Sequence, residues 1–79
     1  MSAAHGERVE GVLVLAGPDA SVEDIPAGEW CVVAQTGAAG IERVTVAYCD
    51  EAFVRVTPIM GMGVEALFRA VADAKRRAR

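Results

Sequence analysis

The stretch IERVTVAYCDEAFVRVT, residues 41–57, decides the fold class of this chain. In its first half, Val44, Val46 and Tyr48 would share one face of an extended chain, with the intervening residues on the other face. Residues 52–57 (AFVRVT) are again rich in valine and aromatic side chains, which favour strands. The Asp-Glu dipeptide between the two halves is short enough to join antiparallel neighbours. The stretch therefore predicts an antiparallel hairpin.

Two further strands are predicted upstream of this hairpin. Residues 8–16 (RVEGVLVLA) contain four consecutive large apolar residues and are followed by Gly-Pro, as expected of one strand buried on both faces. Residues 29–36 (EWCVVAQT) form the second candidate, with Trp30 and Val32 on the same face. Residues 17–28 combine two prolines, two glycines and several acidic or hydroxyl side chains, so we expect a loop there.

Downstream, the sequence predicts a helix over residues 64–77, preceded by a glycine-rich turn. Apolar side chains recur at the spacing of one helical face, which we expect to be buried against the sheet: Val64, Leu67, Phe68, Val71 and Ala74 or Ala78. The predicted fold class is α+β, a small mostly antiparallel sheet of about four strands with one C-terminal amphipathic helix packed on one face. We expect residues 1–7 to be a disordered tail and residues 8–79 to form a single domain.

Composition excludes several classes of protein. The chain has 79 residues and a formal net charge of −3, which argues against a general nucleic-acid-coating protein. The sequence holds no apolar run of the ~18 residues that a membrane span needs, and residues 1–10 have no apolar signal segment, so we expect a cytoplasmic protein that does not bind membranes. Basic residues cluster at the end of the predicted helix, where they complement its dipole: Lys75, Arg76, Arg77 and Arg79.

Residues capable of catalysis or metal binding are few. The two cysteines, Cys31 and Cys49, and the one histidine, His5, form no zinc-binding spacing, and no base is placed beside either thiol. Asp50 and Glu51 fall in an exposed turn, which does not provide the burial that acid–base chemistry requires. The acidic loop resembles a calcium loop only at its start. We therefore expect no metal, no cofactor and no catalytic residue, and a chain that is not an enzyme.

Self-association is the functional expectation that follows most directly from the predicted fold. Valines point to both faces of the first two predicted strands, whereas one helix can cover only one face. An uncovered apolar face marks an interface, either with further copies of the chain in a dimer or higher oligomer or with another protein. The candidate interface residues are Trp30, Val32, Val12 and Val14. The predicted function is that of a small interaction or accessory module.

Two alternative functions stay open at this stage. Glycines before a helix N-terminus can hold an anion, so Gly61, Met62 and Gly63 could bind a small anionic or amino-acid ligand at a subunit interface, as in a regulatory module. Trp30 and Tyr48, the amphipathic aromatic residues, could form the floor of such a pocket. The other alternative is an enzyme whose site is shared between subunits, with Cys49 or Asp50 contributing.

Overall fold

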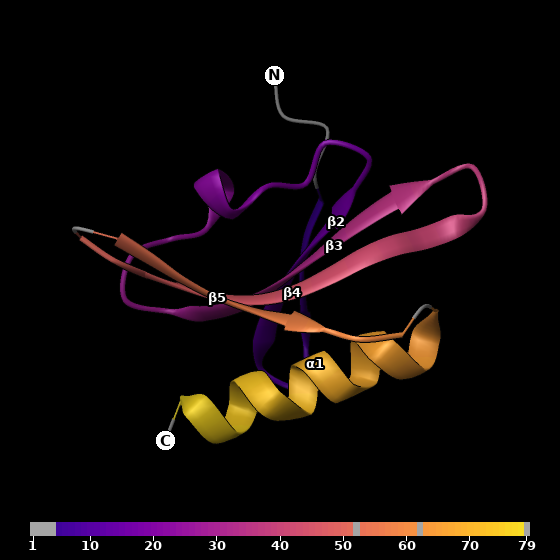
Figure 1. Cartoon of the computed structure of the whole chain (residues 1–79). Coiled ribbons are helices and arrows are strands. Elements are labelled where there is room, and N and C mark those ends of the chain that lie inside the picture. Colours follow the sequence, from indigo (N-terminus) through magenta and orange to yellow (C-terminus); the bar gives the residue numbers. More distant parts are fainter. Residues whose placement is uncertain (1–4, 52, 62, 79) are drawn as a thin grey trace.

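A computed structural model describes residues 5–51, 53–61 and 63–78. Their order is two strands, a short connection with one turn of 3₁₀ helix, three strands and a helix (Figure 1). The elements are β1 (His5–Val9), β2 (Val12–Gly17), η1 (Val22–Asp24), β3 (Trp30–Gly37), β4 (Gly40–Asp50), β5 (Phe53–Ile59) and α1 (Val64–Arg77). The sheet has the spatial order β1-β2-β3-β4-β5, so β1 and β5 are its edges. The predicted α+β class is confirmed.

The predicted hairpin and the predicted helix are both present. β4 and β5 pair antiparallel from Val44↔Ile59 to Asp50↔Phe53, and α1 covers the predicted residues 64–77. No helix among the described residues is long and apolar enough to cross a membrane.

The N-terminal part of the sheet differs from the prediction. Residues 8–16 were expected to form one strand, but the chain reverses at Glu10 and Gly11, which have φ values of 51° and 85°. Positive φ at two successive residues gives the tight turn that suits a two-residue hairpin, so Val9 faces Val12 across an antiparallel β1–β2 pair. This turn raises the number of strands to five. Residues 5–7, expected in the tail, belong to β1, and residues 1–4 lie outside the described residues.

One pair in the sheet is parallel, and its connection covers much of the second face. β2 and β3 run in the same direction, so the chain must cross from one end of the sheet to the other between them. The connection passes over the face opposite α1 (Figure 1) and buries Ala20 and Ile25 against it. Within the connection, Ser21 Oγ accepts a hydrogen bond from the Glu23 N–H at 3.2 Å and caps η1. The expectation of a bare second face is therefore wrong over β2 and β3.

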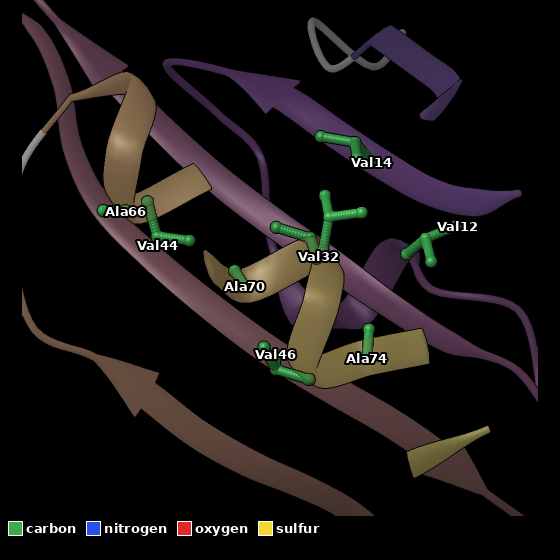
Figure 2. Close-up of a cluster of buried hydrophobic side chains, with 9 residues drawn as sticks. Val12, Val14, Val32, Val44, Val46, Ala66, Ala70 and Ala74 are labelled. Carbon is green, nitrogen blue, oxygen red and sulfur yellow. The ribbon is translucent and has the colours of Figure 1, made fainter. Parts of the chain in front are cut away.

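The larger core lies between the sheet and α1. Figure 2 shows its valines from β2, β3 and β4 pointing toward the alanines of the helix. Ala66, Ala70 and Ala74 occupy the buried stripe, whereas Val64 and Phe68, expected in it, are 61% and 56% exposed. Small side chains let the helix lie close to a sheet of valines, and the larger apolar residues are then displaced to its flank. The predicted stripe is thus correct for Val71 and Ala74, and wrong for Val64 and Phe68.

Candidate functional site

An aromatic pair lies on the helix side of the sheet, where α1 ends. The β3–β4 register sets Trp30 opposite Tyr48, and their ring centroids are 5.1 Å apart with an interplanar angle of 36°. The Arg77 guanidinium carbon, from the last turn of α1, lies 5.4 Å from the centroid of the Trp30 ring. Tyr48 in turn faces Arg55 of β5 in the sheet register. Two aromatic side chains therefore lie in a row that has an arginine position at each end.

A surface pocket of about 580 Å³ opens beside this row. Four parts of the chain contribute to it: the β1–β2 turn, the start of β3, the β4–β5 hairpin and the end of α1. Its walls are formed by Gly11, Val12, Gly28, Glu29, Trp30, Tyr48, Asp50, Arg55, Ala74, Arg77 and Ala78. Such a volume is within the range of small-molecule sites, which combine apolar walls with a few charged groups.

Ion pairs neutralise the carboxylates of Glu29 and Asp73 near the pocket. Glu29 accepts a hydrogen bond from Arg8 of β1, so its charge is compensated. Asp73, one turn before the end of the helix, accepts from Arg77 Nε at 2.9 Å and from Arg76 Nη2 at 2.7 Å. These bonds, that from Arg77 first, hold the pKa of the Asp73 carboxyl below its usual range. One carboxylate shared by two guanidinium groups leaves a net positive charge at this corner of the pocket.

The predicted ligand-binding residues do not come together. Trp30 and Tyr48 line the pocket at the C-terminal end of α1, whereas Gly61 and Gly63 lie at its N-terminal end, about 20 Å away for a helix of 14 residues. Met62 lies outside the described residues. Gly61 and Gly63 have φ values of 105° and 88°, so both permit a turn that other residues would strain. Glu65 occupies the first helical turn and disfavours an anion there.

The predicted interface residues are on the helix side of the sheet. Val12, Val14 and Val32 are buried in the core beneath α1, and Trp30 packs against it while lining the pocket. The structure therefore removes Val14 and Val32 from any surface that a partner could contact, and Val12 borders only the pocket.

The two thiols of the chain lie on the sheet face opposite α1. Cys31 is fully buried, and this burial raises the pKa of its thiol to about 11, with a smaller contribution from Glu29. Cys49, on the same face of the sheet, is half-buried, and both cysteines are free. Within residues 5–51, 53–61 and 63–78, no group of His, Cys, Asp and Glu side chains could hold a metal ion.

The apolar surface that is exposed on the sheet belongs to the edge strand β5. Val54 and Val56 are 37% and 49% exposed, and they lie on the face opposite α1 because they pair with Cys49 and Ala47 of the second core. The connection that covers β2 and β3 leaves both exposed, although its residues 20–22 line a pocket of about 230 Å³ together with Val56. The residue pattern predicts a strand over residues 52–57, and β5 spans Phe53–Ile59, but the pattern does not indicate an edge because it leaves the strand order open.

In three comparisons, no protein-family model, no curated protein and no solved structure is significantly similar to the chain. The pocket and the β5 edge are therefore the basis for a functional proposal.

Proposed function

We propose that this chain is a self-associating interaction module in which β5 of one copy pairs with β5 of a second copy. The observation that carries the proposal is the pair of valines at the uncovered edge of the sheet, Val54 and Val56. An edge strand presents unpaired backbone groups, and exposed apolar side chains along it favour addition of another strand. A second copy would set both valines against apolar side chains of its own β5 and extend the sheet from five strands to ten.

The position of Pro58 indicates which backbone groups of β5 point toward the open edge of the sheet. Residues along an antiparallel strand alternate in pointing their N–H and C=O groups toward one neighbour or the other. Proline has no N–H, so it is tolerated where that group would point away from the paired strand. Pro58 therefore points its backbone nitrogen and C=O toward the open edge. Val56 and Val54 lie two and four residues away along the strand, so their N–H and C=O groups point to the same edge and are available to a partner.

One antiparallel register of two β5 strands is self-complementary. A two-fold axis at Val56 would set this residue opposite its own copy and Val54 opposite Pro58, so apolar side chains meet on the face away from α1. On the helix face, Arg55 would meet Thr57, which avoids the repulsion of two facing arginines. Four backbone hydrogen bonds would form, two at Val56 and two from the Val54 N–H to the Pro58 carbonyl. A two-fold axis at Arg55 would instead set this arginine opposite its own copy, and the two like charges would repel each other.

The other edge of the sheet is less suited to pairing. β1 has five residues, and its central residues, Glu7 and Arg8, are exposed and charged. The Arg8 side chain is already bonded to Glu29 and to the Gly11 carbonyl. Charges on an edge oppose strand addition, so we assign the interface to β5 alone.

The proposed module is not an enzyme. The raised pKa of Cys31 supports this part of the proposal, because a buried neutral thiol is a poor nucleophile. The two free thiols also fit a reducing compartment such as the cytoplasm.

Analytical ultracentrifugation of the reduced protein tests the assembly. We expect the wild-type chain at about 100 µM to sediment mostly as a dimer, which requires a Kd of about 10 µM or less, or about 7 kcal/mol of association free energy. Val56→Lys places a charge at the centre of the interface and should give a folded monomer. Glu7→Lys puts the same side chain in the middle of β1 and should leave the dimer intact. A monomeric wild type would overturn the proposal even if Val56→Lys did not fold.

Single cysteines test the register. In a Cys49→Ala background, Val56→Cys should form a disulfide-linked dimer under mild oxidation, because the two-fold axis brings that position against its own copy. Val54→Cys, on the same face and similarly exposed, would face Pro58 and should not crosslink. Efficient crosslinking through position 54 but not position 56 would contradict the register.

A further inference from the structure

We propose that the pocket beside Trp30 and Tyr48 binds a small organic anion with a flat apolar body. The pocket lies on the helix side of the sheet, whereas Val54 and Val56 lie on the opposite face, and Arg55 is the lining residue that belongs to β5. Binding there would be a function additional to self-association, and it does not depend on the dimer.

The aromatic pair provides a surface for the flat part of the ligand. Trp30 and Tyr48 are both half-buried, so their rings support each other while one side of the pair remains accessible to the pocket. Val12 and Ala74 add apolar contacts from β2 and α1. Rigid aromatic side chains lose little conformational entropy on binding, which suits them to hold a planar group.

Arg77 provides the charge for the anion. Its Nε atom is bonded to Asp73, and no other hydrogen bond of its side chain is made within the described part of the chain, so the Nη groups are available above the Trp30 ring. An arginine held by a carboxylate and an aromatic ring is oriented before the ligand arrives, and its two Nη groups match a carboxylate or phosphate.

The balance of the surrounding charges favours an anion. Asp73 is shared by Arg76 and Arg77, leaving one net positive charge, while Glu29 is neutralised by Arg8. Asp50 at the exposed rim and the Arg55 side chain offset each other. The C-terminal end of a helix carries partial negative charge, but three basic residues in the last turn of α1 counter it.

Isothermal titration calorimetry with three probes of the same shape tests the sign of the charge. The probes are 2-naphthoate, the neutral 2-naphthamide and the cationic 2-naphthylmethylammonium. For a ligand of this size we expect 2-naphthoate to bind with a Kd on the order of 10–100 µM and the neutral and cationic probes to bind at least about tenfold more weakly. Equal affinity for the anionic and neutral probes, or no binding of 2-naphthoate, would overturn the proposal.

Two neighbouring arginines provide a matched pair of variants. Arg76 and Arg77 both bond Asp73, but only Arg77 contacts Trp30 and lines the pocket. Arg77→Gln should lower the affinity for 2-naphthoate by about tenfold, the loss expected for one charge-assisted contact. Arg76→Gln removes the same formal charge but no contact in the pocket, so it should lower the affinity by a smaller factor, about two- to threefold. The chain has one tryptophan, so the NMR signal of the Trp30 indole N–H reports on the pocket directly. This signal should shift with the same Kd, and equal effects of the two variants or an unshifted signal would place binding elsewhere.

Discussion

At the residue scale, Asp73 links the end of α1 to the charges of the pocket. Its side chain is 14% exposed and accepts hydrogen bonds from two arginines. These bonds stabilise the carboxylate, so its pKa is lower in the folded chain than in the unfolded chain. A carboxyl with this shift stabilises the fold above its unfolded pKa of about 3.9, and the contribution is lost as the pH falls through the folded pKa.

We expect Asp73→Asn to lower the free energy of unfolding at pH 7 by about 1 kcal/mol, the upper range for such helix pairs. At a pH below the folded pKa the difference from wild type should vanish, because the carboxyl is then neutral in both states. Urea denaturation of both proteins at the two pH values measures this difference in the free energy of unfolding. Asp19→Asn, at an exposed position in the β2–β3 connection, serves as the control and should change stability by less than about 0.5 kcal/mol. A deficit that persists at low pH would show that Asp73 acts through packing instead.

At the scale of elements, the packing of α1 depends on the small size of its buried residues. Ala70 is fully buried against the sheet, while Ala72, half a turn further on, is exposed. Ala70→Leu should destabilise the chain by about 1–3 kcal/mol, because the added methyl groups force the helix away from the valines below it. Ala72→Leu makes the same change at a solvent-exposed position and should stay within about 0.5 kcal/mol of wild type. Thermal unfolding followed by circular dichroism compares them, and equal losses would exclude close helix–sheet packing as the cause.

Local patterns predicted the elements whose signals are short-range. The alternation around Val46 was sufficient to define the β4–β5 hairpin, and glycines before residue 64 marked the start of α1. The β1–β2 turn was missed because Glu10 adopts a positive φ that its side chain does not signal, unlike the Asn-Gly or Asp-Gly pairs typical of such turns. Helical spacing identified an apolar side of α1, but the choice of the alanine stripe over Phe68 depends on how closely the sheet approaches.

At the scale of the whole molecule, the candidate site could not be assembled from sequence because its parts come from four segments. The sequence singled out Trp30 and Tyr48 as aromatic residues of interest, yet only the register of β3 and β4 makes them neighbours. Arg77 was assigned to the helix dipole, and its position over the Trp30 ring depends on where α1 crosses the sheet. The valines of β5 are exposed because the connection over β2 and β3 leaves them uncovered, and the backbone groups beside them are open because β5 is an edge, which is a property of the complete strand order.

The size of the chain gives the proposed self-association a thermodynamic consequence. A domain of 79 residues buries a smaller fraction of its surface than a larger one, so an added interface contributes a large share of its stability. If unfolding and dissociation are coupled, the thermal midpoint should rise by about 3–5 °C for each tenfold increase in protein concentration, because the dimer gains about 0.7 kcal/mol per chain from mass action. Scanning calorimetry from about 10 µM to 1 mM measures this slope.

Val56→Lys should have a midpoint independent of concentration, whereas Glu7→Lys should keep the wild-type slope. A flat wild-type midpoint would mean that the five strands are stable as a monomer and that β5 contributes nothing to the stability of the fold through pairing.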